Sequence, residues 1–118
     1  MNNLRNSVRL IGNLGATPEV RELPSGKKLA RVNIATTERY KDSDGKVVSE
    51  THWHNLVGWG KIADYMMKNL DKGHEVAVQG KLLSRSYTDK EGIKRNITEI
   101  NVGEVMRTGL RKDKVVED

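Results

Sequence analysis

The sequence contains no cysteine and no phenylalanine, and its few aromatic residues are two tryptophans and three tyrosines. Without cysteine, no disulfide can hold the fold and no thiolate can act as a nucleophile or a metal ligand, which suits a reducing cytoplasm. Without phenylalanine, the core must be built from Val, Ile, Leu, Met and Ala. The positions of the remaining aromatic side chains are therefore informative.

Long apolar stretches are missing as well. No apolar run approaches the roughly 20 residues that a membrane-spanning helix needs, and the opening MNNLRNSVRLIG has no apolar signal-peptide core. We therefore expect a soluble cytoplasmic protein that has no membrane partner.

The chain is short and basic. Its 118 residues fit one domain with a modest core, which we place at residues 1–107, followed by a short charged tail at 108–118. It carries 21 Lys and Arg against 16 Asp and Glu, which gives a net charge of +5. This excess favours an anionic partner without distinguishing nucleic acid from a membrane surface or an acidic protein.

Alternation of apolar and polar residues predicts most of the secondary structure. Strands are expected at residues 7–14, 29–39, 47–59, 75–87 and 93–106. In the second of these, Ala30, Val32 and Ile34 share the face that we expect to be buried. Segment 17–28 holds both prolines and predicts a loop that can include a short edge strand. Asp44-Gly45 predicts a tight hairpin turn in which these two residues have positive φ angles.

One segment has helical periodicity. Ile62, Met66 and Leu70 recur four residues apart on one stripe, which predicts an amphipathic helix over 61–70, and Gly73 is placed to end it. The predicted order is therefore three strands, one helix and two strands. This order matches an all-β fold with one helix, the five-stranded Greek-key barrel called the OB-fold, whose helix lies between strands three and four.

Two tyrosines accompany cations. Tyr40 lies between Arg39 and Lys41 at the end of the second predicted strand. In the fourth strand, alternation puts Val76, Val78 and Leu82 on the face expected to be buried. Tyr87 falls on the opposite face, together with Lys81 and Arg85.

Trp53 and Trp59 lie on one face of the third predicted strand, because they are an even number of positions apart. Tryptophan usually packs in a core, so burial is the ordinary interpretation. The tyrosines favour a different one, since rings interleaved with cations suit single-stranded nucleic acid: exposed bases stack on the rings while phosphates meet the cations. Duplex DNA offers no such base faces. The pattern therefore predicts binding to single strands.

Five segments, taken in order, resemble the family of bacterial single-stranded DNA-binding proteins. They are VRLIGNLGATPEVR, ARVNIAT, THWHNLVGWGKIADY, LDKGHEVAVQGKL and RSYTDKEGIKR. The likeness spans about residues 6–107. It implies an OB-fold subunit, of bacterial or phage origin, that assembles into a homotetramer. It also implies wrapping of single-stranded DNA in replication, recombination and repair, without cofactor, and association with the nucleoid.

The resemblance also assigns residues. The stacking positions of the family fall on Tyr40, Trp53, Trp59 and Tyr87, and its phosphate contacts on Arg5, Arg31, Lys41, Lys61, Lys72 and Arg85. His54 matches a histidine that makes subunit contacts. Tyrosine stands at 40 and 87 where the family commonly has tryptophan, and tryptophan at 59 where it has phenylalanine; stacking survives each exchange.

The final LRKDKVVED departs from the family pattern. Family members commonly continue through a flexible linker to an acidic tip that recruits replication and repair proteins. Either the chain is truncated or this member lacks such recruitment, and the sequence leaves both open. An OB-fold adaptor that assembles replication-restart partners is the alternative function.

Other motifs in the sequence give only weak evidence for a cofactor, a metal site or catalysis. Gly58-Trp59-Gly60-Lys61-Ile62-Ala63 fits a dinucleotide fingerprint, but one helix leaves no doubly wound sheet for it. His52 and His54 share a strand face and could bind a metal with His74, yet no clustered cysteine or carboxylate completes a site. No nucleophile elbow or catalytic triad is recognisable. We expect neither a metal nor an enzyme.

Overall fold

The structure is a computed structural model that describes residues 4–109 and 116–117. Its elements in chain order are β1 (Val8–Leu14), β2 (Glu19–Glu22), β3 (Lys28–Lys41), β4 (Val47–Trp59), α1 (Lys61–Asn69), β5 (Glu75–Thr88), β6 (Lys94–Arg107) and β7 (Val116–Glu117). The five predicted strands and the helix are all present. The segment that holds the prolines contains the short edge strand β2.

Five strands close into a barrel. They pair in the order β1-β5-β6-β4-β3, and β3 returns to β1 through the pairs Asn13↔Ala35 and Leu14↔Ile34. The contact between β4 and β6 is parallel, whereas the other pairings are antiparallel. With α1 between the third and fourth barrel strands, this is the OB-fold, as the element order predicts.

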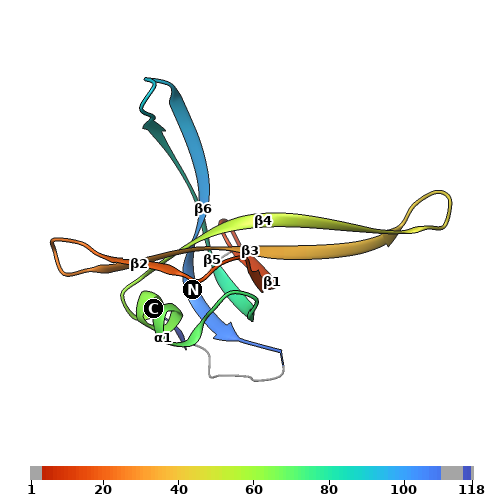
Figure 1. Cartoon of the computed structure of the whole chain (residues 1–118), viewed down its shortest axis with the longest axis horizontal. Coiled ribbons are helices and arrows are strands. Elements are labelled where there is room, and N and C mark those ends of the chain that lie inside the picture. The colour runs from red at the N-terminus through yellow and green to blue at the C-terminus, as the bar shows by residue number, and fades with distance from the viewer. Residues whose placement is uncertain (1–3, 110–115, 118) are drawn as a thin grey trace.

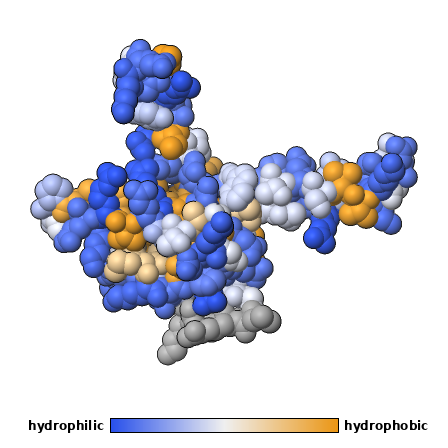
Figure 2. Space-filling view, viewed as in Figure 1, coloured by the Kyte–Doolittle hydropathy of each residue, from blue (hydrophilic) through white to orange (hydrophobic). Residues whose placement is uncertain are grey.

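Two hairpin arms extend from the barrel (Figure 1). In one, β3 and β4 stay paired from Leu29↔Trp59 to Lys41↔Val47, and in the other β5 and β6 stay paired out to Thr88↔Lys94. Figure 2 shows that both arms are mostly hydrophilic, with isolated apolar patches. The arms therefore add surface to the barrel without adding core.

Both arms end in the same kind of turn. Asp42 Oδ1 accepts hydrogen bonds from the backbone N–H groups of Asp44 and Lys46, each at 2.9 Å. Only Gly45 has positive φ there, at 78°, so the expectation of positive φ at Asp44 is wrong. The physical reason is that the Asp42 carboxylate closes a longer loop, in which a single left-handed residue suffices.

The helix ends one residue earlier than predicted, and not at Gly73. Leu70 is already extended, with φ −112° and ψ 143°, and its side chain is buried. Burial of this leucine directs the chain back toward the barrel. Gly73, at φ 88°, lies in the following turn, where its N–H donates to the carbonyl of Leu14.

The core contains the apolar face predicted for β3 and most of the one predicted for β5, together with one side of α1. Ile34, Leu56 and Val76 are buried from the strands, and Ile62 and Met66 from the helix. No helix within residues 4–109 and 116–117 is long and apolar enough to cross a membrane.

Leu82 is the one exception on the predicted buried face of β5. Val76 and Val78 are buried as expected, but Leu82 is 46% exposed. At this point β5 leaves the barrel and continues into its arm, and every residue from 81 to 88 is exposed. Alternation predicts which residues share a face, but not where a strand passes the rim of the barrel.

The C-terminal segment is described only in part. β6 ends at Arg107, close to the predicted end of the domain, and Val116 pairs with Val105 of β6 in the short strand β7. The rest of the predicted tail, residues 110–115 and 118, lies outside the described residues. A separate domain and tail stay a prediction.

Candidate nucleic-acid interface

Both tryptophans lie on the outer face of β4. Trp53 is 59% exposed and Trp59 is 36% exposed, so neither is sealed inside the barrel. Their cross-strand partners on β3 are Ala35 and Leu29. Six residues of extended strand separate the two rings by roughly 20 Å, which leaves room for more than one nucleotide between them.

Trp53 lies against a glycine. A Cβ built on Gly15 would come within 2.9 Å of the Trp53 ring atom Cη2 and within 2.6 Å of Asn33 Oδ1. The ring therefore packs directly on the backbone of the loop that follows β1. This support fixes one edge of the indole, while most of the side chain stays open to solvent.

The two tyrosines lie on the arms. Tyr40, near the end of β3, is 50% exposed and pairs across the arm with Val48. Tyr87, near the end of β5, is 46% exposed and pairs with Arg95. The four predicted stacking residues are therefore all exposed, two of them on the barrel and one on each arm.

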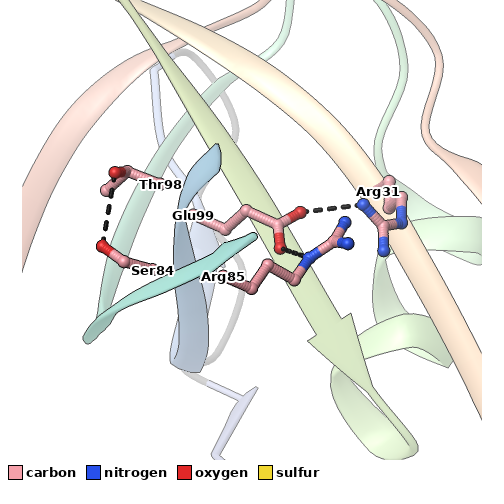
Figure 3. A network of polar contacts seen from close by, with 5 residues as sticks. All are labelled: Arg31, Ser84, Arg85, Thr98 and Glu99. Carbon is pink, nitrogen blue, oxygen red and sulfur yellow. Dashed lines mark hydrogen bonds and ion pairs between the residues drawn. The ribbon is translucent and has the colours of Figure 1, made fainter. Parts of the chain in front are cut away.

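One buried carboxylate joins two of the predicted phosphate contacts. Glu99 of β6 is 7% exposed, and its Oε2 accepts from Arg31 Nη1 at 2.8 Å while its Oε1 accepts from Arg85 Nε at 2.9 Å. Figure 3 shows both guanidinium groups converging on this side chain. The hydrogen bond that Arg85 donates to Glu99 raises the pKa of Arg85 above its usual value. Two cations compensate the cost of burying the charge.

Glu99 was missed by sequence reasoning, because its two partners are 14 and 68 residues away along the chain. The available signal was a lone acidic residue in an apolar strand segment, ITEINV. Such a residue needs a cation when its strand is central. Only the registers of β6 with β5 and β4, and of β4 with β3, show which cations reach it.

The other predicted phosphate contacts are exposed cations, and none of them forms an ion pair within the described part of the chain. They are Arg5, Lys41, Lys61 and Lys72. Lys41 adjoins Tyr40, and Lys61 begins α1 two residues after Trp59. Their placement beside the rings agrees with the predicted interface, whereas their contacts with DNA stay a prediction.

His54 and His74 have separate hydrogen-bond partners. His54 faces away from the tryptophans, is half-buried, and lies 2.9 Å from Thr36 Oγ1 through its Nε2. His74 Nδ1 accepts from the backbone N–H of Asp71. Among the described residues, no group of three His, Asp or Glu side chains is arranged to hold a metal. The role of His54 in subunit contacts stays a prediction.

A pocket with both polar and apolar walls opens on the tryptophan face, and its apolar part includes Val32, Leu56 and Ile97. It has a volume of about 270 Å³ and is lined from β3 by Arg31 and Asn33, from β4 by Asn55, and from β6 by Glu99. Asn33 and Asn55 are cross-strand partners, and Asn55 lies between Trp53 and Trp59 along β4. The exposed face therefore combines rings, cations and amides.

Comparison with known proteins gives a consistent result. The model of the single-strand binding protein family matches residues 5–108. "Single-stranded DNA-binding protein 1" of Xylella fastidiosa is 42% identical over 109 residues, which are 92% of this chain and 80% of that protein. The protein of the same name from Chlorobaculum tepidum is 42% identical over 107 residues, which are 90% of this chain and 66% of the relative.

Solved structures agree. An SSB of Plasmodium falciparum in complex with ssDNA superposes with a TM-score of 0.82 at 32% identity, over 88% of this chain and 95% of the other. A deletion mutant of the single-stranded DNA binding protein from Thermus aquaticus gives 0.77 at 27% identity, over 90% of this chain and 51% of the other. Because the family model covers nearly the whole sequence and the barrel has the same architecture, the chain belongs to the single-strand binding protein family.

Proposed function

We propose that this chain binds single-stranded DNA with little regard to sequence, and so protects unwound strands in replication, recombination and repair. The observation that carries the proposal is the exposure of Trp53 and Trp59 on one barrel face, with the exposed Lys61 two residues after Trp59. Association with nucleoid or phage DNA would follow from this activity.

The binding has two physical components. Stacking of a base on an exposed ring contributes roughly 1–3 kcal/mol, and four such rings are exposed, at Tyr40, Trp53, Trp59 and Tyr87. Cations that neutralise phosphates add an affinity that salt removes. The arms carry two of the rings beyond the barrel, so a strand that crosses the barrel face can continue along an arm.

A titration with oligo(dT) tests the proposal. Tryptophan fluorescence should fall as bases stack, and Trp53→Ala should weaken binding by about 1–3 kcal/mol. Met67→Ala, on an exposed helix position, is a control that should bind normally. Unchanged emission together with undiminished binding of Trp53→Ala would refute stacking, and magnesium-dependent loss of labelled oligonucleotide would indicate a hydrolase instead.

We also propose that the chain forms a homo-oligomer, which the family resemblance suggests is a tetramer. Ile11 is 63% exposed on the outer face of β1, beside a hollow of about 490 Å³ that Ala77 of β5 and Met106 of β6 also line. An exposed apolar surface of this kind favours self-association. Light scattering should report a tetramer, and Ile11→Asp should reduce its mass, whereas Met67→Glu should not.

A further inference from the structure

The two faces of the β3–β4 arm differ in charge. Trp53 pairs with Ala35, and paired residues share a face, so the tryptophan face of the barrel continues outward along every second residue of both strands. We call its continuation on the arm the cation face, which carries hydroxyl groups and cations at Thr37, Arg39, Lys41, Ser49 and Thr51. Residues 37–41 and 47–51 are all described, and none of those on this face is acidic.

The opposite face of the arm, which we call the carboxylate face, carries the acidic residues. Glu38 and Glu50 lie directly across from each other there, His52 follows along β4, and Tyr40 pairs with Val48 near the tip. His52 Nε2 lies 3.6 Å from Glu50 Oε1, which is the one ion pair among the described residues of this arm. The arm is therefore a ribbon with its cations on one side and its carboxylates on the other.

This separation of charge does not serve the stability of the arm. Opposite charges stabilise a hairpin when they face each other across the strands, and like charges in that position destabilise it. Arg39 instead pairs with Ser49, and Lys41 with Val47, while two carboxylates oppose each other on the far side. Arg39 and Lys41 are exposed, and neither forms an ion pair within residues 4–109 and 116–117. Both cations are therefore available to an anionic ligand.

The cation face suits the backbone of a nucleic acid strand. Arginine, lysine and hydroxyl side chains all donate to phosphate oxygens. Thr37 Oγ1 and Thr51 Oγ1 lie 3.4 Å apart, between Trp53 and Arg39 along the arm. From Ala35 to the last cation the face extends by roughly 20 Å, which leaves room for more than one phosphate. On the carboxylate face a phosphate would instead meet two negative groups that offer only acceptors.

We propose that the cation face extends the path of the single strand from Trp53 along the β3–β4 arm, and that Arg39 is a phosphate contact on it. Arg39 is not among the contacts that the family resemblance assigns. The inference rests on the proposed binding of single-stranded DNA and gives its course beyond the barrel. Tyr40 lies on the carboxylate face, so its ring meets the strand only where the strand turns over the edge of the arm.

Neutralising one residue on each face separates position from net charge. Arg39→Gln removes a positive charge from the cation face, and Glu38→Gln removes a negative charge from the carboxylate face. The double variant has the net charge of the wild-type chain. Positions 38 and 39 are adjacent on β3 and both exposed, so the two single variants are matched. Poly(dT) is titrated at several salt concentrations, and thermal melting checks that each variant is folded.

Arg39→Gln should reduce the slope of log affinity against log salt by about 0.7, the value for one phosphate neutralised on a single strand. The double variant should show the same loss, and Glu38→Gln should keep the wild-type slope. A wild-type slope in folded Arg39→Gln would overturn the contact. A wild-type slope in the double variant alone would assign the effect to net charge and overturn the choice of face. Failure of the wild-type chain to bind poly(dT) would instead overturn the proposed function.

Discussion

At the scale of single residues, the exposure of Trp53 depends on a neighbour with no side chain. Gly15 lets the indole lie on the backbone, and its φ is not in the left-handed region. Conformational freedom is therefore not the reason for glycine at this position. The reason is the close approach of the Trp53 ring, so a methyl group here should displace the ring rather than strain the backbone.

Gly15→Ala should consequently weaken oligo(dT) binding several-fold while the protein stays folded. The new Cβ would lie within 2.9 Å of Trp53 Cη2, so the ring has to move from its platform. Gly103→Ala is the control, because a Cβ there would meet only Gln79 O at 3.8 Å. Fluorescence polarisation and thermal melting measure the two effects. Equal affinities for the two variants would mean that the position of Trp53 is unimportant.

Glu99 makes the second residue-scale prediction. Glu99→Gln leaves two guanidinium groups around a neutral amide, and the free energy of unfolding should fall by about 1–3 kcal/mol. The penalty is kept moderate by the arginines, whose side chains are 44% and 47% exposed.

Urea denaturation of Glu99→Gln beside Glu19→Gln provides the comparison. Glu19 and Arg21 form an exposed pair at 3.8 Å, which should contribute little. If both variants lose the same stability, the buried network is no more important than a surface ion pair.

At the scale of elements, the two arms show what local sequence can predict. The β3–β4 hairpin follows from alternation and from its Asp44-Gly45 turn, and β4 has the bounds predicted for it. The positive φ assigned to Asp44 was wrong, because the pattern does not reveal that Asp42 closes the loop. A carboxylate that accepts backbone hydrogen bonds is visible only once the turn is folded.

The turn of the β5–β6 arm should open in acid. Arg95 Nε donates to Asp89 at 2.9 Å, and this bond, with those from the Ile93 and Glu91 backbone, lowers the pKa of Asp89. A lowered pKa in the folded state means that the stabilisation is complete above the ordinary Asp value of about 3.9. It is lost as pH falls through the lower folded value.

Hydrogen exchange of the Ile93 amide, followed as the pH falls, measures this loss after correction for intrinsic exchange rates. Asp89→Asn should reduce protection at neutral pH as well. Asp44→Asn, in the other turn, should leave Ile93 unchanged. Protection of Ile93 that does not vary between about pH 2 and pH 6 would contradict the assigned role of the Asp89 carboxylate.

At the scale of the whole molecule, the order of the elements in the sequence predicts a barrel. The sequence does not predict which strand pairs close it. The pairs between β1 and β3 and the parallel contact of β4 with β6 join segments that no local pattern connects. The same limit explains the site. The exposure of the rings can be predicted from strand alternation and from neighbouring charges. The Glu99 network and the pocket that Asn33 and Asn55 line form only when β3, β4 and β6 come together.

Rings stack on bases and cations neutralise phosphates, so only the cations should make the affinity depend on salt. Log affinity should fall linearly with log salt, at about −0.7 per phosphate neutralised on a single strand. Lys61→Gln should reduce the steepness by about 0.7, because Lys61 is exposed and without an ion pair among the described residues. Trp53→Ala should lower affinity at every salt concentration and leave the slope unchanged, since stacking releases no counterion.

Lys68→Gln is the matched control, as it removes the same charge from the other end of α1. Its slope should equal that of the wild-type chain if the strand passes the start of the helix, beside Trp59. Equal changes in slope for the two lysine variants would mean that net charge alone sets the salt dependence. Unequal changes locate the phosphates, because a released counterion requires a cation close to the strand.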